Sequence, residues 1–427
     1  MKKVKIAIMG IGTVGGGTYE ILTTNRELIK KTRGLDITVK KILDRAVENV
    51  TARGIDASLA CTDLEAIVTD PEISIVVETM GGVEPARSFI LRVLAAGKSV
   101  VTANKELISK CGYELEAAAK KTGAGLYYEA SCVGGVPIIR TLTDSMQANN
   151  ITEILGIING TTNYILTKMS KEGLTYEAAL KEAQQLGYAE FNPTADVEGY
   201  DAMYKLSILS SLAFHTCIPY TSIYREGITK ITAEDIAVGK EMGYTLKLLA
   251  IGKRSGNEIE ARVHPTFVPN SHPLASVNDA FNAVFLKGDF VDDIMLYGRG
   301  AGARPTGSAI VSDIVVCAEQ ASRHSYSDFN NNGRLEEGIV VKSNFSSRYY
   351  LSFKLMDKPG VLGKITGILG DNGVSINKAM QHGDDADGYA PVVFFTHLTT
   401  EDAVRKSLDI ISRSDAVKSL DSLIRVL

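Results

Sequence analysis

The chain has 427 residues, and at roughly 150 residues per domain this length predicts two to four domains. It is 45% hydrophobic and 22% charged, which is typical of folded globular proteins and excludes a fibrous or intrinsically disordered chain. Its 46 Lys and Arg nearly balance its 50 Asp and Glu, which gives a net charge of −4. This balance argues against nucleic-acid binding, which usually needs a basic surface.

The cysteines and the apolar segments indicate the compartment. The five cysteines are scattered without a CxxC pair, at Cys61, Cys111, Cys132, Cys217 and Cys317. An odd and scattered set favours reduced thiols over disulfides or a zinc site. The longest uncharged stretch, 206–224, contains several polar residues and Pro219, so it does not resemble a membrane span. No signal-peptide cleavage site follows the N-terminal apolar run, and we therefore expect a soluble cytoplasmic protein with no membrane contact.

Over the first 130 residues, short apolar strands alternate with helical patterns. The predicted strands are Val4–Met9, Ile37–Leu43, Ile73–Glu78, Ser99–Thr102 and Leu126–Tyr128. The predicted helices are Val14–Lys31, Pro85–Ala96 and Lys105–Lys121. Because strands that are apolar on both faces need helices on both sides, this pattern predicts a doubly wound parallel α/β sheet over residues 1–130.

Residues 131–324 have a different character. Helical patterns come first, at Thr175–Leu186 and Tyr200–Phe214, and strand-like runs follow at Thr245–Lys253, Ile259–Val268 and Asn282–Lys287. A further helix is predicted over Thr306–Arg323. Runs of one type followed by runs of the other favour an α+β domain.

The C-terminal residues 348–427 form a separate small unit. The predicted elements are strand Tyr349–Met356, helix Gly360–Asn372, strands Val374–Gln381 and Val392–Leu398, helix Glu401–Arg413 and strand Val417–Val426. The βαββαβ order predicts a ferredoxin-like domain. The preceding segment 325–347, which includes Asn330-Asn331-Asn332-Gly333, is polar and predicts a linker.

A glycine-rich loop follows the first predicted strand. Residues 10–15 have the pattern GxGxxG and lie directly before a predicted helix. Glycines permit the tight turn and the close approach of a pyrophosphate, and the helix N-terminus attracts its charge. The candidate dinucleotide site is therefore Gly10, Gly12, Thr13, Val14 and Gly15, with a purely structural turn as the alternative.

Asp44 and Arg45 end the second predicted strand, where a dinucleotide-binding sheet reads the ribose. An acidic residue favours the 2′-hydroxyl of NAD, whereas an arginine favours the 2′-phosphate of NADP. Asp44 favours NAD and Arg45 favours NADP, so the preference between the two cofactors stays open.

Asp201 and Lys205 lie four residues apart on one predicted helix and therefore on one face. Such a pair is most often a solvated surface ion pair. The upstream segment 187–199 is rich in carboxylates, glycine and proline and opens onto this helix, which favours a functional site instead.

The motifs resemble those of one enzyme family. Residues 183–205 follow the pattern A-x3-GYA-x2-NP-x2-DV-x-G-x-D-x3-K, and further matching segments are GIGTVGGG at 10–17, VVETMGG at 76–82, VTANKEL at 101–107, YEASCVGGVPII at 128–139, GIINGTTNYIL at 156–166 and GRGAG at 298–302. Through these motifs residues 4–323 resemble the homoserine dehydrogenases, with a Rossmann-type first domain. The motif DKPGVL at 357–362 makes the C-terminal unit resemble an ACT domain.

The resemblance implies NAD(P)-dependent interconversion of L-homoserine and L-aspartate 4-semialdehyde, on the route to threonine, methionine and isoleucine. It assigns Lys205 as the acid/base and places Lys105 near the reacting oxygen and the cofactor. Two nearby ammonium groups disfavour each other's charge, so we expect a lowered lysine pKa. Glu190 and Asp201 match the residues that bind the substrate's amino group. Thr102, Lys105, Gly187 and Gly302 complete the expected cofactor site.

The resemblance also implies two further sites. Glu129, Cys132, Gly134 and Val136 match a sodium site built mainly from backbone carbonyls, for which a structural turn is the alternative. In the ACT domain, Asp357, Gly360, Val361 and Leu362 are the candidate site for an amino-acid effector, expected to be L-threonine. An ACT unit that serves only as a dimerisation surface is the alternative there.

Phe191-Asn192 and Cys132 depart from the commoner family pattern at positions that need no particular side chain. The competing interpretations are another amino-acid or semialdehyde oxidoreductase, and a non-catalytic dinucleotide sensor. The strand-rich middle unit predicts a homodimer or homotetramer through paired sheets. We also expect a chain that ends near Arg348 to remain active and to lose inhibition by threonine.

Overall fold

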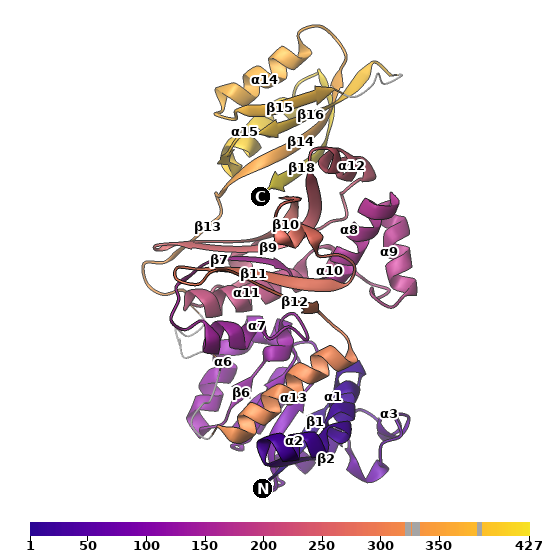
Figure 1. The fold of residues 1–427 in the computed structure, drawn as a ribbon, viewed down its shortest axis with the longest axis vertical. Coiled ribbons are helices and arrows are strands. Elements are labelled where there is room, and N and C mark those ends of the chain that lie inside the picture. The colour runs from indigo at the N-terminus through magenta and orange to yellow at the C-terminus, as the bar shows by residue number, and fades with distance from the viewer. Residues whose placement is uncertain (321–325, 327–333, 382–386) are drawn as a thin grey trace.

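The computed structural model describes residues 1–320, 326, 334–381 and 387–427. Three units follow one another along the long axis of the molecule, from the indigo N-terminal unit to the yellow C-terminal unit (Figure 1). Within the described ranges, no helix is long and apolar enough to cross a membrane.

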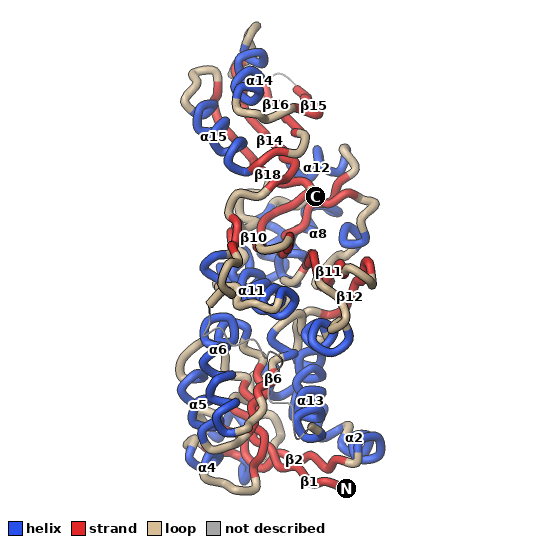
Figure 2. The backbone as a smooth tube through the Cα atoms, turned by 90° about the vertical axis from the view of Figure 1, so that its left-hand side faces the viewer, coloured by secondary structure: helices blue, strands red, loops and turns tan. Residues whose placement is uncertain are grey.

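The N-terminal unit is built on six parallel strands. Their order is β3-β2-β1-β4-β5-β6, with β1 (Lys2–Met9), β2 (Leu35–Leu43), β3 (Ala60–Cys61), β4 (Ile73–Glu78), β5 (Ser99–Thr102) and β6 (Leu126–Tyr127). The connecting helices are α1 (Thr13–Thr24), α2 (Arg26–Arg33), α3 (Val47–Thr51), α4 (Glu65–Val68), α5 (Ala86–Ala95) and α6 (Lys105–Thr122). Helices cover both faces of the sheet (Figure 2), which confirms the predicted doubly wound fold.

Two features of this unit differ from the sequence prediction. The helix predicted over 14–31 is two helices, because Asn25 leaves the helical conformation (φ −97°, ψ 13°) and ends α1. Asparagine favours such ends since its side chain competes with the helix for backbone hydrogen bonds. The helix predicted over 306–323, α13 (Ala303–Glu319), packs on α1 and so covers the first sheet, although we had grouped it with residues 131–324. Gly17 permits this contact, since a Cβ there would lie 2.2 Å from the carbonyl oxygen of Ala303.

The middle unit has an antiparallel sheet. Its order is β12-β11-β7-β9-β10, with β7 (Ile151–Ile157), β9 (Tyr244–Ser255), β10 (Glu258–Pro269), β11 (Phe281–Gly288) and β12 (Asp292–Arg299). Its helices are α7 (Ile138–Arg140), α8 (Gly160–Glu172), α9 (Tyr176–Gln185), α10 (Thr194–Val197), α11 (Tyr200–Phe214) and α12 (Ala233–Glu241). The buried helix α11 packs on this sheet and on α6, so it lies where the first two units meet (Figure 2).

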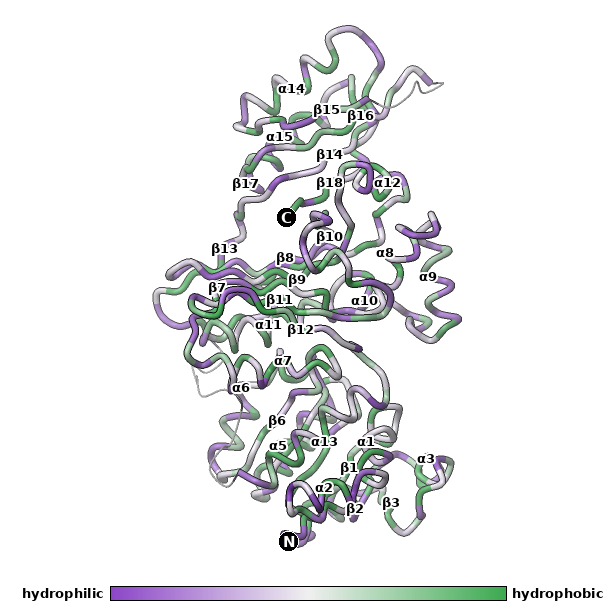
Figure 3. Tube along the Cα trace, viewed as in Figure 1, coloured by the Kyte–Doolittle hydropathy of each residue, from purple (hydrophilic) through white to green (hydrophobic). Residues whose placement is uncertain are grey.

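The C-terminal unit confirms the predicted βαββαβ order. Its elements are β14 (Ser346–Met356), α14 (Val361–Asp371), β15 (Ile376–Gln381), β16 (Tyr389–Thr396), β17 (Thr399–Thr400), α15 (Glu401–Ser412) and β18 (Val417–Val426). Its strands and helices enclose a hydrophobic core of their own. Figure 3 shows hydrophobic stretches in the interior of all three units.

The C-terminal unit is not merely tethered to the middle unit. Strand β18 pairs in parallel with β10, so that Thr266 faces Arg425 and Phe267 faces Val426, and the two sheets become continuous. The predicted linker is also ordered in part: β13 (Val340–Lys342) pairs with β10. Residues 330–333 of that linker lie outside the described residues.

Candidate functional site

The glycine loop has the conformation that a phosphate-binding turn requires. Gly10 has φ +92°, and a Cβ on Gly15 would lie 2.1 Å from the carbonyl oxygen of Gly10. Helix α1 begins at Thr13 after Gly12, with no side-chain cap, so its first N–H groups are not satisfied by a capping side chain. Val14 also lines a cavity that begins at this loop.

Asp44 braces the glycine loop from the neighbouring strand. Its Oδ2 accepts the Ile11 N–H at 2.9 Å, and its Oδ1 accepts the Arg45 N–H at 2.8 Å. Burial opposes the charge of Asp44, but these backbone donors and the Asn49 amide outweigh it and lower the pKa of the carboxyl.

A cavity of about 500 Å³ opens beside Asp44, lined by Ile11, Gly12, Asp44, Asn49, Ala52 and Arg53. Arg53 was missed in the sequence, because no motif marks it. Its guanidinium lies against the loop, 2.3 Å from where a Cβ on Gly16 would be. Arg45, which we had expected at the ribose, does not line this cavity.

A second cavity of about 230 Å³ lies at the carboxyl ends of β4 and β5, lined by Val14, Glu78, Thr79, Gly81, Gly82, Ala103, Asn104, Lys105 and Glu106. Thr102 does not line it; its hydroxyl donates to Glu78 Oε2 at 2.5 Å. The other Glu78 oxygen accepts the Met80 and Gly81 N–H groups at 2.7 and 3.1 Å. Burial nevertheless raises the pKa of Glu78. Thr102 and Glu78 thus shape the loop that borders Lys105.

Asp201 joins two lysines from different units. Lys205 Nζ lies 2.7 Å from Asp201 Oδ2, and Lys105 Nζ lies 3.3 Å from Asp201 Oδ1. Asp201 and Lys205 are 6% and 8% exposed, which excludes the solvated helix pair that the sequence left open. Lys205 Nζ also donates to the carbonyl of Ile158 at 2.9 Å. The N-terminus of α6 and the first turn of α11 therefore meet at one carboxylate.

Asn159 organises the acidic side of this cluster. Its Nδ2 donates to Asp201 Oδ2 at 2.9 Å and to Asp196 Oδ1 at 2.7 Å, while its Oδ1 caps α8 by accepting the Thr162 N–H. Burial, and then the neighbouring Asp201, raise the pKa of Asp196. Asn159 lies inside the GIINGTTNYIL motif, but nothing in the sequence indicated that it bridges two carboxyl groups.

The electrostatics of the cluster differ from the sequence expectation. Burial alone would raise the pKa of Asp201, but the ammonium groups of Lys205 and Lys105 outweigh it and hold that pKa well below its usual value. The Asp201 carboxylate in turn raises the pKa of Lys105. The expected lowering of the pKa is therefore wrong for Lys105, because a carboxylate lies between the two cations.

Glu190 and Gly187 lie in the loop that precedes α10. Gly187 has φ +76°, a conformation that favours glycine. Glu190 is exposed, and within the described part of the chain its carboxylate has no hydrogen-bond or ion-pair partner. Gly302 has φ +117° and begins α13 without a side-chain cap. Glu190 is thus the one predicted substrate residue whose carboxylate is free for a ligand among the described residues.

The predicted cation-site residues form one buried turn. The Glu129 carboxylate accepts the Ile139 and Arg140 N–H groups, each at 2.9 Å, and so anchors the start of α7. Burial, and then Asp313, raise the pKa of Glu129 to about 7.

The rest of this turn packs tightly. A Cβ on Gly134 would lie 2.4 Å from the carbonyl oxygen of Gly300, so the turn packs on the GRGAG loop. Cys132 and Val136 are buried, and burial raises the pKa of Cys132 to about 12. Among the described residues, no cluster of three His, Cys, Asp or Glu could hold a metal ion.

The four predicted effector residues line one cavity of about 350 Å³ in the C-terminal unit. Its walls are Leu355, Met356, Asp357, Lys358, Pro359, Gly360, Val361, Leu362, Gln381, Ala390 and Val392. Gly360 has φ +89° and begins α14 without a side-chain cap. Gln381 Nε2 donates to Asp357 Oδ1 at 3.3 Å, at the edge of hydrogen-bond range.

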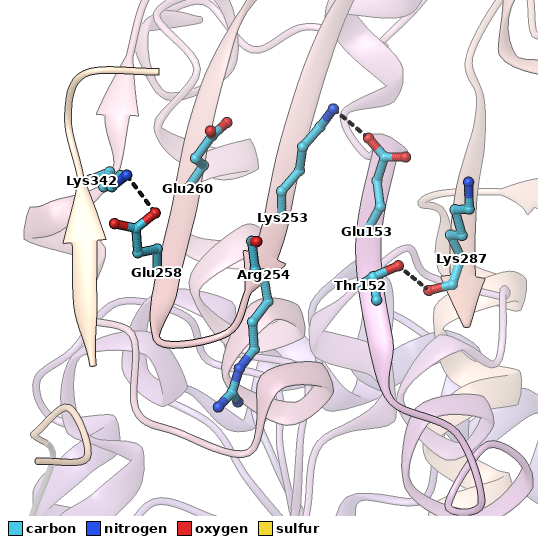
Figure 4. A pocket seen from close by; sticks show the side chains of 9 residues that line it. Thr152, Glu153, Lys253, Arg254, Glu258, Glu260, Lys287 and Lys342 are labelled. Carbon is cyan, nitrogen blue, oxygen red and sulfur yellow. Dashed lines mark hydrogen bonds and ion pairs between the residues drawn. The ribbon is translucent and has the colours of Figure 1, made fainter. Parts of the chain in front are cut away.

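A further hollow of about 320 Å³ lies on the middle sheet and is lined by charged side chains (Figure 4). Lys253 pairs with Glu153 at 2.7 Å, and Lys342 pairs with Glu258. Four basic and three acidic side chains line this hollow, so its net charge of +1 is too small to indicate a ligand.

Comparison with known families identifies all three units. The model described as homoserine dehydrogenase matches residues 137–315, its NAD-binding domain model matches residues 10–129, and the ACT domain model matches residues 349–413.

Similar proteins cover the whole chain. The homoserine dehydrogenase of Bacillus subtilis (strain 168) is 38% identical over 427 residues, with 100% of this chain and 99% of that protein covered. The one from Synechocystis is 41% identical over 435 residues, with 99% of each covered. The crystal structure of a homoserine dehydrogenase from Thiobacillus denitrificans is 40% identical, has a TM-score of 0.93, and covers 100% of this chain and 99% of its own.

One solved relative includes a cofactor. A hyperthermophilic archaeal homoserine dehydrogenase in complex with NADPH is 29% identical with a TM-score of 0.63, and covers 74% of this chain and 97% of its own. Since the family models and the full-length relatives agree, the chain belongs to the homoserine dehydrogenase family of oxidoreductases, with an NAD-binding domain and a C-terminal ACT domain.

Proposed function

We propose that this chain interconverts L-homoserine and L-aspartate 4-semialdehyde with NAD or NADP, in threonine, methionine and isoleucine biosynthesis. The observation that carries this proposal is the buried carboxylate of Asp201 between the ammonium groups of Lys205 and Lys105. Lys105 also lines the cavity at the carboxyl ends of β4 and β5, where doubly wound sheets bind their ligands.

The lysines perform the proton chemistry. An ammonium has three N–H donors, and Lys205 uses two of them on Asp201 and on the carbonyl of Ile158. The third donor is available for the substrate oxygen. In the reducing direction, Lys205 gives this proton to the aldehyde oxygen while Lys105 stabilises its developing negative charge. In the oxidising direction, Lys205 takes the hydroxyl proton back. The bound dinucleotide supplies or accepts the hydride.

The acidic residues hold the amino acid and the lysines. Glu190 has an exposed carboxylate that suits the substrate's ammonium group. The resemblance assigns Asp201, like Glu190, to the substrate's amino group. Each Asp201 oxygen also pairs with one lysine, so Asp201 fixes the positions of Lys205 and Lys105 as well. Asn159 keeps Asp196 and Asp201 together, and with Glu190 these carboxylates are the proposed partners of the substrate's ammonium group.

The cofactor site follows from the two cavities of the first unit. The glycine loop binds the pyrophosphate, and Gly187 and Gly302 border the nicotinamide half. The cavity beside Asp44 takes the adenosine half, where Asp44 suits the ribose hydroxyls of NAD and Arg53 suits the 2′-phosphate of NADP. The NADPH complex of the archaeal relative supports use of the phosphorylated cofactor.

Sodium is the proposed ion of the turn 129–136. Carbonyl oxygens suit a hard monovalent cation. Within the described residues, the carbonyls of Cys132 and Gly134 accept no backbone hydrogen bond, which leaves them free for such an ion. Ile139 and Arg140 occupy the Glu129 carboxylate, so Glu129 would bind the ion through its main-chain oxygen. The main-chain oxygens of Glu129 and Val136 each accept one backbone N–H, from Cys132 and Ile138, and each has a second lone pair for the ion.

L-Threonine is the proposed effector of the ACT cavity, acting as a feedback inhibitor. Asp357 suits its ammonium group, and the uncapped N–H groups at the start of α14 suit its carboxylate. A homodimer or homotetramer brings two ACT units together and is part of this proposal.

The test is an assay of the purified protein with L-homoserine and each oxidised dinucleotide, followed by nicotinamide absorbance. We expect turnover with L-homoserine and none with L-serine, whose hydroxyl is one carbon short. Turnover of a different hydroxy amino acid alone would support another oxidoreductase. Dinucleotide binding without turnover of any substrate would support the sensor.

A further inference from the structure

A short segment contacts both the active-site helix and the ACT domain. We call residues 224–228 the strap. It begins with β8 (Tyr224–Arg225), which pairs in parallel with β10 at Arg262 and Val263. The Glu226 N–H continues this pairing and donates to the carbonyl of Val263 at 2.8 Å. Residues 224–226 of the strap are therefore fixed to the middle sheet.

At its catalytic side, Arg225 holds the residues that precede α11. Its guanidinium lies 3.6 Å from the centroid of the Tyr200 ring, in a cation–π contact. The same group donates to the carbonyl of Glu198, and its Nη1 lies 3.9 Å from the Glu198 carboxylate. Gly199 lies between these two contacts and starts α11 in a left-handed conformation, with φ +79°. Asp201 is the second residue of that helix.

The backbone of the strap also packs closely against the residues that precede Gly199. The Ile228 N–H donates to the carbonyl of Val197 at 2.8 Å. A Cβ on Gly227 would lie 2.3 Å from that carbonyl oxygen and 2.7 Å from the Cα of Glu198. Only glycine fits such an approach, so residues 197–200 have little freedom to move relative to the strap.

At its other side, the strap enters a cluster of charges from the ACT domain. We call Tyr224, Glu226, Glu401, Arg405 and Arg425 the ACT cluster. The Glu226 carboxylate accepts hydrogen bonds from Arg425 and, at 2.9 Å, from Arg405. Arg405 Nη2 also donates to the Tyr224 hydroxyl at 2.6 Å. Arg425 is 1% exposed, so its contact with Glu226 is largely shielded from solvent, whereas Arg405 lies at the exposed edge of the cluster.

The ACT cluster connects onward to the effector cavity. Glu401 accepts hydrogen bonds from Arg425 Nη2 at 2.5 Å and from Arg405 Nε at 2.8 Å. It also accepts one from the Tyr349 hydroxyl at 2.9 Å. Tyr349 lies in β14, whose far end carries two walls of the cavity, Leu355 and Met356. One strand thus runs from the cavity to the cluster.

We propose that Arg225 is a positioning residue for Asp201, and that the strap transmits the state of the ACT cluster to the first turn of α11. The catalytic part of this proposal rests on the proposed function, whereas the mechanical part concerns the fold alone. Asp201 meets Lys205 at 2.7 Å and Lys105 at 3.3 Å, so a small shift of the helix start changes both distances. Misplacement by about 1 Å is enough to lower a rate about 100-fold.

The first experiment measures hydrogen–deuterium exchange of residues 197–205 together with kcat and KM, in the full-length protein. In Arg225→Met we expect exchange in this segment to become at least about tenfold faster, as local opening is favoured. We expect kcat/KM for L-homoserine to fall about 10- to 100-fold with the KM for dinucleotide unchanged, and Arg225→Lys to recover part of both. Arg254→Met is the matched control, because Arg254 holds the opposite end of α11 through the carbonyl of Phe214.

The second experiment tests transmission from the ACT domain. Arg405→Met removes a contact to Glu226, and we expect the same changes in residues 197–205 with a smaller size, about two- to fivefold. Arg413→Met is its control, since Arg413 follows the same helix and pairs only with Asp409 among the described residues.

Unchanged exchange in Arg225→Met, or an equal change in Arg254→Met, would overturn the positioning role. Equal effects of Arg405→Met and Arg413→Met would overturn the transmission. If the wild-type protein failed to oxidise L-homoserine, the proposed function would fail, while the exchange measurements would still decide whether the strap holds α11.

Discussion

The molecule contains two partly buried clusters of charge, and they are built differently. In the ACT cluster, two arginines face two carboxylates and a tyrosine hydroxyl, so the charges balance and the hydrogen bonds are made within the protein. In the active-site cluster, the two lysines pair with one carboxylate, Asp201, while the Asp196 carboxyl accepts a hydrogen bond from Asn159 instead. A balanced cluster suits a permanent joint between units, whereas the second cluster retains donors for a substrate. The difference in charge and in free donors therefore assigns a structural role to the ACT cluster and a catalytic role to the active-site cluster.

Removing Lys205 is expected to have the largest effect. Lys205→Ala should lower kcat by a factor of roughly 100 to 10,000, the range for loss of one positioned acid/base. Dinucleotide binding, measured by calorimetry, should change little. Lys168→Ala is the matched control, because Lys168 forms an (i, i+4) pair with Glu172 on another helix and should keep near-normal turnover. Near-normal turnover of Lys205→Ala itself would show that Lys205 is not the acid/base.

Breaking the balanced cluster should instead affect stability. Arg425→Met leaves the buried Glu401 without its main partner and the half-buried Glu226 with Arg405 alone, and should lower the free energy of unfolding by about 3–5 kcal/mol. Arg413→Met breaks an exposed pair and should change that energy by less than about 1 kcal/mol. Chemical denaturation of both variants makes the measurement. Equal small changes would show that the ACT cluster is not a structural joint.

The buried cation Lys247 sharpens the comparison, because within the described ranges it forms no ion pair with a carboxylate. Lys247 is 1% exposed and donates to Asn163 Oδ1 at 3.1 Å and to the carbonyl of Val277. Burial lowers the pKa of Lys247 to about 8. Between about pH 8 and the ordinary lysine pKa near 10.4, the unfolded chain binds a proton that the native chain does not, so stability rises with pH.

The expected gain across that window is at most about 3 kcal/mol. The stability difference between wild type and Lys247→Met, measured by denaturation across this range, isolates the gain from other titrating groups. A difference that does not change with pH would mean that Lys247 keeps an ordinary pKa.

The smallest expected effect concerns the cofactor. Arg53 lines the cavity beside Asp44 and Arg45 does not, so Arg53→Ala should shift the ratio of kcat/KM for NADP over NAD toward NAD by about tenfold. Arg45→Ala is the control and should shift the same ratio by less. A larger shift in Arg45→Ala than in Arg53→Ala would show that Arg45 binds the 2′-phosphate of NADP.

Local pattern was sufficient for much of the fold. The run Ile73–Glu78 is rich in β-branched apolar residues, and its predicted bounds equal those of β4. Strand β12 was missed because its side chains are exposed or half-buried and show no apolar alternation. Strand β7 and helix α8 were also missed, because the motif at 156–166 indicated the family and its periodicity was not used to predict elements.

Contacts between residues that are far apart in the sequence could not be predicted. The Asp201–Lys205 pair follows from helical spacing, but its burial depends on α6 and β7. Asn159, Arg53 and Arg225 carry no local signal, because their partners lie elsewhere in the chain. The pairing of β18 with β10 was equally invisible, and it does not support the expectation that a chain ending near Arg348 stays active. Such a chain would lose the strand that covers Thr266 and Phe267.

The most direct test of the active-site cluster is the pH profile of kcat/KM for L-homoserine in wild type and Asp201→Asn. The carboxylate raises the pKa of Lys105, so a neutral amide of the same shape should move the alkaline limb of the profile to lower pH. An unshifted limb, with kcat/KM lowered equally at every pH, would contradict the account that Asp201 sets the charge of Lys105.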